Sequence, residues 1–181
     1  MLLNTPEAEM GWLATQFTLS DPDGKTYQLS ELQGENGLVI AFICNHCPYV
    51  ISIVDRFVTD AKVLQSKGIN VLAINSNDYS YVPEDSPDKM RAFSKENGFT
   101  FPYLIDEDQS VAKSYGAVCT PDFFGFNKQG ELQYRGRLDD ARMKNSSTRK
   151  TELVDAMIQT ADTGKGPTTQ HPSMGCSIKW K

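Results

Sequence analysis

The sequence of 181 residues contains few cysteines and no long apolar run. No window approaches the roughly 18 consecutive apolar residues that a membrane-spanning helix requires. The first residues, Met1 to Glu7, have neither a basic leader nor an apolar stretch like that of a signal peptide. We therefore expect a cytoplasmic, soluble protein that does not contact a membrane.

Basic residues are also scarce. The chain has 18 Lys and Arg against 23 Asp and Glu, which gives a formal net charge of -5 at pH 7. The basic side chains are scattered, whereas nucleic-acid-binding proteins gather theirs in a patch or stripe. The sequence thus predicts no nucleic-acid partner. A glycine-rich phosphate loop is missing too, so we expect no bound cofactor.

Four cysteines are too few to hold a chain of this length together as a disulfide scaffold. Where ordinary thiols stay reduced, catalysis or metal binding is the more common use of such residues. The length and a hydrophobic content of 39% fit one domain with its own core. We expect this domain to span residues 1–163 and a C-terminal tail, residues 164–181, to dock on it.

The order of the predicted elements indicates an α/β fold. Residues 37–43 are almost all apolar, as in a central strand that is covered on both faces. Apolar residues then recur at helical spacing from Val50 to Leu64, and residues 69–75 have the pattern of a second strand. Because such crossovers are right-handed and parallel, the pattern predicts a sheet flanked by helices.

Further elements are expected on both sides of this unit. An N-terminal β-hairpin is predicted from residues 17–20 and 25–29, which alternate apolar and polar side chains around a turn. The polar loop from Asn75 to Asp85 is expected to border the site. Later elements are predicted as a helix from Ser86 to about Gly98, a strand at 101–105, a helix at 108–115, a hairpin of 123–126 with 132–135, and a helix over about 147–163.

The motif that carries chemistry is Cys44-Asn45-His46-Cys47, where the first central strand ends and a helix begins. A Cys-x-x-Cys pair in a βαβ pattern is typical of redox proteins. The sequence predicts that Cys44 lies at the helix N-terminus, where free N–H groups and the helix dipole stabilise a thiolate. We therefore expect Cys44 to be the nucleophile and Cys47 to resolve the mixed disulfide.

His46 lies between the two cysteines and is expected to tune them. A partly charged imidazole favours the thiolate and makes the disulfide more oxidising, although an exposed histidine without a role is the alternative. Zinc would need ligands drawn from the four cysteines, His46 and His171, but no second paired motif fixes such a set. Haem attachment is excluded because Pro48, and not histidine, follows Cys47. We expect no metal.

Thr120 and Pro121 form a second candidate region. A proline there can adopt a cis peptide bond beside a strand edge that receives a peptide, so we expect these two residues to bind substrate. Cys119, next to them, and Cys176, near the C-terminus, are candidates for additional redox thiols. The alternative for each is a small buried apolar side chain.

These motifs resemble the alkyl hydroperoxide reductase/thiol-specific antioxidant family of thioredoxin-like proteins. The resemblance is carried by residues 17–32, by the Cys-Asn-His-Cys-Pro-Tyr motif at 44–49 and by residues 119–124. The motif at 44–49 is similar to that of a peroxiredoxin-like branch, and the match runs from about Gly11 to the C-terminus. It implies a thioredoxin-like fold with a central mixed β-sheet.

The resemblance also implies residue roles. Cys44 matches the attacking cysteine of thioredoxin-like enzymes, Cys47 their second cysteine and Pro121 the cis-proline on the substrate side. Peroxiredoxins carry proline and threonine seven and three residues before the peroxidatic cysteine. Gly37 and Ala41 hold these positions before Cys44, so the hydroxyl that organises peroxide is missing.

We therefore predict an enzyme, a thiol–disulfide oxidoreductase that cycles Cys44 and Cys47 between dithiol and disulfide. Its partners would be protein or small-molecule thiols and disulfides and an external reductant, and the chain is expected to be a monomer or weak dimer. One alternative is a thiol-dependent peroxidase in which Cys44 attacks peroxide. The other is a metal-binding or redox-sensing module.

Overall fold

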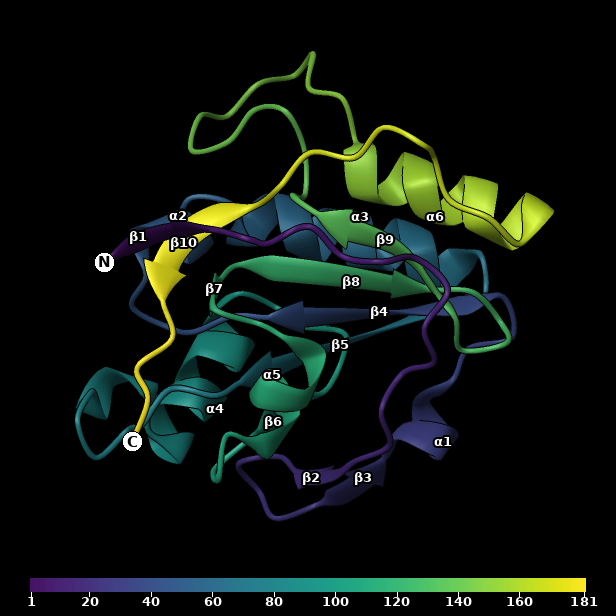
Figure 1. Ribbon diagram of the computed structural model, residues 1–181. Coiled ribbons are helices and arrows are strands. Elements are labelled where there is room, and N and C mark those ends of the chain that lie inside the picture. Colours follow the sequence, from purple (N-terminus) through teal and green to yellow (C-terminus); the bar gives the residue numbers. More distant parts are fainter.

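A seven-stranded mixed sheet forms the centre of the computed structural model, which describes residues 1–181 (Figure 1). Its order is β3-β2-β6-β5-β4-β8-β9. β4 to β6 are parallel neighbours and the other pairs are antiparallel, which confirms the predicted fold class. The strands are β2 (Thr18–Ser20), β3 (Thr26–Gln28), β4 (Gly37–Phe42), β5 (Ile69–Asn75), β6 (Tyr103–Ile105), β8 (Asp122–Phe126) and β9 (Leu132–Gly136).

Helices lie on both faces of this sheet. Figure 1 shows α3 and α6 together on one side and α5 on the other. None of the helices is long and apolar enough to span a membrane. Their bounds are α1 (Leu29–Leu32), α2 (Pro48–Ile51), α3 (Val54–Ser66), α4 (Pro87–Glu96), α5 (Ser110–Tyr115) and α6 (Glu152–Thr163), with a 3-10 turn, η1 (Pro83–Asp85).

β4 explains why the central run of the sequence is apolar throughout. All six of its residues are buried, because alternate side chains enter two different cores. Val39 and Ala41 pack with side chains of α3 and α6. Leu38 and Ile40 pack on the opposite face, with side chains of α5. β4 is thereby fixed on both sides, and so is the point at which the cysteine motif leaves it.

The N-terminal hairpin is confirmed. β2 and β3 pair antiparallel, and the Asp21 carboxylate accepts hydrogen bonds from the backbone N–H groups of Asp23 and Lys25 in the turn. Gly24 has φ +85°, a left-handed conformation that side chains other than glycine rarely adopt. The turn residues therefore fix the register of this hairpin.

A second sheet joins the two ends of the chain beside the cysteine motif. Its order is β1 (Leu2–Asn4), β10 (Met174–Ser177) and β7 (Cys119–Thr120), and both pairs are antiparallel. In Figure 1 the purple N-terminal strand and the yellow C-terminal strand lie side by side. The sequence pattern did not predict β1 or β7, since each is short and paired only with a distant segment.

Two helix predictions are wrong in their bounds. The single helix expected after the motif is divided into two, and Ser52 and Ile53 form the break, as the C-cap of α2 and the N-cap of α3. The last helix begins at Glu152, and the preceding residues belong to a loop. That loop is fixed by Arg149, whose guanidinium binds the buried Asp60 carboxylate at 2.7 Å.

Arg149→Met is expected to lower the free energy of unfolding by about 3 kcal/mol, because Asp60 keeps a buried charge without its counter-ion. Asp139 keeps its ion pair with Arg56 after the substitution and should therefore contribute little to this loss of stability. Urea denaturation at pH 7 measures the effect, and Lys150→Met in the same loop is the control. A loss no larger than that of the control would contradict the structural role of the ion pair.

Candidate active site

The two cysteines of the motif hold different positions at the strand-to-helix junction. Cys47 is the N-cap of α2, and its carbonyl oxygen accepts hydrogen bonds from the N–H groups of Val50 and Ile51, both at 2.9 Å. Pro48 follows at the first helical position, where its missing N–H costs nothing. The prediction that Cys44 lies at the helix N-terminus is therefore wrong, because Cys44 lies three residues before the N-cap.

Both thiols meet at Thr120. The Cys44 sulfur lies 3.3 Å from the Thr120 hydroxyl, and the Cys47 sulfur lies 3.4 Å from the Thr120 carbonyl oxygen. The following bond, Thr120–Pro121, is cis, as the sequence predicted. The sulfurs are deeply placed, with 1% of Cys44 and 0% of Cys47 exposed.

Hydrogen bonding separates the acidities of the two thiols. The pKa of Cys47 is lowered to about 4, chiefly because the Cys44 thiol donates a hydrogen bond to its sulfur. The Cys176 thiol and the N–H groups of Cys176 and Val50 add to this effect, and burial opposes it. The pKa of Cys44 is raised well above its ordinary value by its hydrogen bond to Cys47, by burial and by the charge of Asp85. These interactions favour Cys47 as the thiolate.

The other two cysteines lie on β7 and β10, the two strands that pair at Thr120. Cys176, on β10, lies directly opposite Thr120 in the antiparallel register, and Cys119 precedes Thr120 on β7. Burial raises the pKa of Cys119 to about 12 and that of Cys176 to about 11. All four cysteines of the chain are free thiols.

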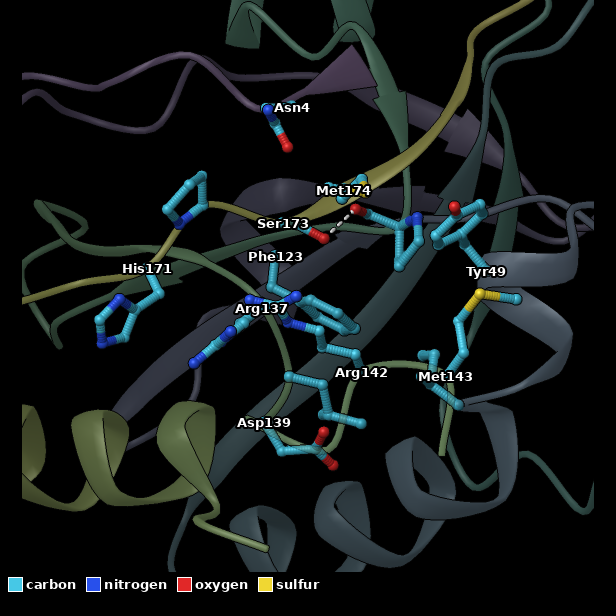
Figure 2. A pocket seen from close by; sticks show the side chains of 14 residues that line it. Asn4, Tyr49, Phe123, Arg137, Asp139, Arg142, Met143, His171, Ser173 and Met174 are labelled. Atoms are coloured by element: carbon cyan, nitrogen blue, oxygen red, sulfur yellow. Dashed lines mark hydrogen bonds between the residues drawn. The ribbon is translucent and has the colours of Figure 1, made fainter. Parts of the chain in front are cut away.

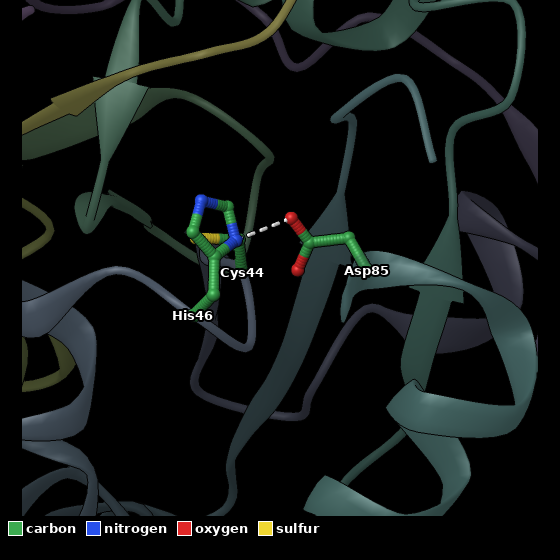
Figure 3. Close-up of side chains that lie close together, drawn as sticks. All are labelled: Cys44, His46 and Asp85. Atoms are coloured by element: carbon green, nitrogen blue, oxygen red, sulfur yellow. Dashed lines mark ion pairs between the residues drawn. The ribbon is translucent and has the colours of Figure 1, made fainter. Parts of the chain in front are cut away.

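His46 lies beside a buried carboxylate (Figure 3). Its Nδ1 is 2.7 Å from an oxygen of Asp85, without the alignment of a hydrogen bond, and 30% of the imidazole is exposed. Asp85 is 1% exposed and also accepts hydrogen bonds from the Asn45 N–H at 2.7 Å and from the Asn77 amide at 2.8 Å. Asp85 therefore holds the motif loop at two consecutive residues.

Asn45 extends this network. Its side-chain oxygen accepts a hydrogen bond from the Tyr103 hydroxyl at 2.8 Å, and its amide donates to the Glu84 carbonyl oxygen at 2.9 Å. The side-chain amide of Asn75 donates to the Tyr103 hydroxyl at 3.2 Å and to the Asp85 carboxylate at 3.3 Å. The sequence placed the loop from Asn75 to Asp85 near the site, but nothing in the pattern singled out Asp85 or Tyr103.

Cys44, His46 and Asp85 also form a group whose possible ligand atoms all lie within 4.8 Å of one another. The four cysteines do not form such a group, and His171 belongs to none. Zinc accepts sulfur, nitrogen and oxygen ligands, but the Asp85 oxygens already accept three N–H hydrogen bonds. The group is therefore better suited to holding the motif loop than to coordinating an ion.

A cavity of about 220 Å³ lies beside the cis-proline (Figure 2). Arg137, Arg142 and His171 bring basic groups to it, while Tyr49 and Phe123 contribute aromatic walls. Neither sulfur of the motif lines it. The remaining lining residues are Asn4, Ile53, Pro121, Leu138, Asp139, Met143, Pro172, Ser173 and Met174.

A cis-proline that faces a cysteine pair at the end of a parallel strand defines the thioredoxin-like class, and this chain belongs to it. Residues 10–135 match the model of the AhpC/TSA family, and the chain is a member of that family. The family that the sequence resembles is thus confirmed.

Two curated relatives illustrate the range of this family. A putative peroxiredoxin of Mycobacterium tuberculosis is 26% identical over 132 residues, which cover 73% of this chain and 79% of the relative. The thiol-disulfide oxidoreductase ResA of Halalkalibacterium halodurans is 27% identical over 125 residues, which cover 69% of this chain and 66% of ResA. The relatives thus include both enzyme types considered from the sequence.

Solved structures agree with the fold. An uncharacterized conserved protein from Geobacillus kaustophilus is 41% identical, with a TM-score of 0.93 over 100% of this chain and 97% of that one. The thioredoxin domain of a thiol-disulfide oxidoreductase from Bacteroides vulgatus is 13% identical, with a TM-score of 0.66 over 86% and 99% of the two chains. The second likeness establishes the thioredoxin-like fold alone.

Thiolate absorbance should show one group that titrates at acid pH, since the pKa of Cys47 is lowered to about 4. Cys47→Ser is expected to abolish this transition, whereas Cys44→Ala should move it to higher pH because the strongest hydrogen bond to the thiolate is lost. If Cys44→Ser, in place of Cys47→Ser, removed the acid transition, the assignment of the thiolate to Cys47 would be wrong.

Asp85→Asn is expected to lower the pKa of Cys44, because the negative charge that disfavours a second thiolate is removed. The same absorbance titration should show the second thiol ionising at lower pH than in the wild type. Asp88→Asn, on the exposed start of α4, is the control and should leave the titration unchanged. An unchanged second transition in Asp85→Asn would argue against this electrostatic contribution.

Proposed function

We propose that the protein is a thiol–disulfide oxidoreductase whose centre cycles between the Cys44–Cys47 dithiol and its disulfide. The observation that carries this proposal is the cysteine pair whose two sulfurs both contact Thr120, with Cys47 at the N-cap of α2 and its pKa lowered. A thiolate with a neighbouring thiol is the arrangement that thiol–disulfide exchange requires.

The residue roles follow from the acidities. The Cys47 thiolate attacks one sulfur of a substrate disulfide, forms a mixed disulfide and releases the other sulfur as a thiolate. Cys44 then attacks the Cys47 sulfur, which frees the second substrate thiol and leaves a Cys44–Cys47 disulfide. His46, on the exposed side of the motif, is suited to donate a proton to the departing thiolate. These roles of Cys44 and Cys47 reverse those expected from the sequence.

Each turnover transfers two electrons from the cysteine pair to the substrate disulfide. An external thiol reductant would supply two electrons to return the Cys44–Cys47 disulfide to the dithiol. Substrates would be protein or small-molecule disulfides that lie against Thr120 and Pro121. Since both sulfurs are buried, part of the surrounding surface must move before a substrate reaches them. A cytoplasmic location and a monomeric or weakly dimeric state remain predictions from the sequence.

A thiol-dependent peroxidase is the second candidate. It is favoured by the peroxiredoxin relatives. It is also favoured by Cys44, which lowers the pKa of Cys47 and lies three residues before it, at the position where peroxiredoxins carry threonine. In that reaction the Cys47 thiolate attacks the peroxide, forms a sulfenic acid and releases water or an alcohol. Cys44 condenses with the sulfenic acid to give a disulfide and a second water.

Rates with a small disulfide and with hydrogen peroxide separate the two functions. We expect reduced protein to release thiol rapidly from the disulfide, and to consume peroxide no faster than an ordinary free thiol does. Cys47→Ser should abolish thiol release, since the low-pKa thiolate is lost, while Cys119→Ala should retain it. Stopped-flow absorbance with mass-spectrometric mapping of the bond provides the measurement.

Peroxide consumption orders of magnitude faster than that of an ordinary thiol, ending in a disulfide at Cys47, would make the protein a peroxidase. Inertness toward both oxidants would overturn both enzymatic proposals. Full activity of Cys47→Ser would instead overturn the assignment of the attacking residue.

A further inference from the structure

The tail strand β10 brings a third thiol to the centre. Cys176 is registered opposite Thr120, and directly opposed residues of antiparallel strands project to the same face. The Thr120 hydroxyl on that face contacts Cys44. Cys176 packs against the core that contains Cys44 and Cys47, and its proximity helps to lower the pKa of Cys47. Cys47 therefore has two thiols beside it, one on its own loop and one on the tail.

The sequence of the tail is fitted to this contact. A Cβ atom added to Gly175 would lie 1.7 Å from the Thr120 carbonyl oxygen, so a residue with a side chain cannot occupy this position without moving the strand. Just before it, the buried Ser173 donates its hydroxyl hydrogen to the Pro121 carbonyl oxygen. The tail backbone therefore packs directly on the cis-proline bond.

The segment after Cys176 is anchored as firmly. Ile178 is 3% exposed and belongs to the core on the α5 side of the sheet. The Lys179 N–H donates to the Asn77 side chain at 2.8 Å, and its carbonyl oxygen accepts from the Gln109 amide at 2.8 Å. Cys176 is thus held between two fixed points.

The position of β10 is also that of a bound peptide. Extended substrates bind by adding a strand to an exposed sheet edge, and β7 offers such an edge immediately before the cis-proline. β10 occupies it through the pairs Cys176 with Thr120 and Ser177 with Cys119. The sulfur of Cys176 therefore stands where the sulfur of an extended substrate would meet Cys47.

Access to solvent distinguishes Cys176 from the other thiols. Cys44, Cys47 and Cys119 are at most 1% exposed, whereas Cys176 is half-buried. Cys119 neighbours Thr120 along the strand, so its side chain projects to the opposite face, away from the motif. Cys176 is thus the one cysteine in contact with Cys47 that an external thiol can approach.

We infer that Cys176 is a third redox cysteine, which forms a disulfide with Cys47 and transfers the oxidising equivalents of the buried pair to the surface. The inference rests on the proposed function. In the transfer step, the Cys176 sulfur attacks Cys47 of the Cys44–Cys47 disulfide, and the proton of Cys176 passes to the departing Cys44 sulfur. Two electrons and one proton are exchanged within the chain, and the external reductant then acts on the Cys47–Cys176 disulfide.

Stoichiometric oxidation of Cys44→Ser by a small aromatic disulfide tests this inference. If Cys176 is a redox partner, each protein releases two equivalents of the aromatic thiol and mass spectrometry of the acid-quenched sample shows a Cys47–Cys176 bond. Cys44→Ser combined with Cys176→Ser should release one equivalent and retain the mixed disulfide. Cys44→Ser combined with Cys119→Ala is the matched control and should behave like Cys44→Ser.

Release of a single equivalent by Cys44→Ser, with Cys176 still open to alkylation, would overturn the inference while leaving the proposed function intact. Absence of thiol release from the wild-type protein would instead overturn the proposed function.

A second variant tests whether the docking of β10 determines the rate at which the Cys47–Cys176 disulfide forms. In the Cys44→Ser background, Gly175→Ala should slow closure of the Cys47–Cys176 bond by roughly tenfold or more, because alignment of the two sulfurs is lost. With Cys44 present, Gly175→Ala should still form the Cys44–Cys47 disulfide, because both of these cysteines lie on the motif loop, and circular dichroism verifies the fold. An unchanged rate of Cys47–Cys176 disulfide formation in Gly175→Ala would overturn the role of the docked strand.

Discussion

The pairing of the Cys44 and Cys47 thiols against Thr120 is the interaction on which the rest of the site depends. It makes the two thiols unequal, with the pKa of Cys47 lowered and that of Cys44 raised. Its geometry depends on elements that surround both residues. β4 is fixed by cores on its two faces, Cys47 caps the start of α2, and Asp85 accepts the N–H of Asn45 between them. A reactive thiolate can therefore exist in a place that water hardly reaches.

The sequence allowed the central part of the fold to be predicted because its signals are local. The apolar run of β4, the turn at Gly24 and the cis bond at Pro121 each follow from a few neighbouring residues. The start of α2 was misjudged by three residues, although Pro48 offered a signal, since proline is favoured at the first helical position. The expected acidities of Cys44 and Cys47 were exchanged as well, because the pKa of Cys47 is lowered chiefly by the neighbouring Cys44 thiol, which the position of the helix start does not show.

The parts that the sequence could not show depend on distant contacts. Asp85 is separated from Asn45 by forty positions, and its function is visible only when both are folded together. β7 has two residues and gains a partner only from β10, more than fifty residues later. The late start of α6 likewise depends on Arg149 reaching Asp60 on another helix. In each case the decisive partner is absent from the local pattern.

Asn77 gives the tail and the motif a common support. Its side-chain oxygen accepts the N–H of Lys179, and its amide donates to the Asp85 carboxylate that lies against His46. A molecule that binds only when the tail is lifted must therefore change the environment of Asp85. Thermodynamic reciprocity then requires the converse, that the charge state of the motif alters the free energy of lifting the tail. Entry to the centre and the electrostatic state of the centre are thus linked quantities.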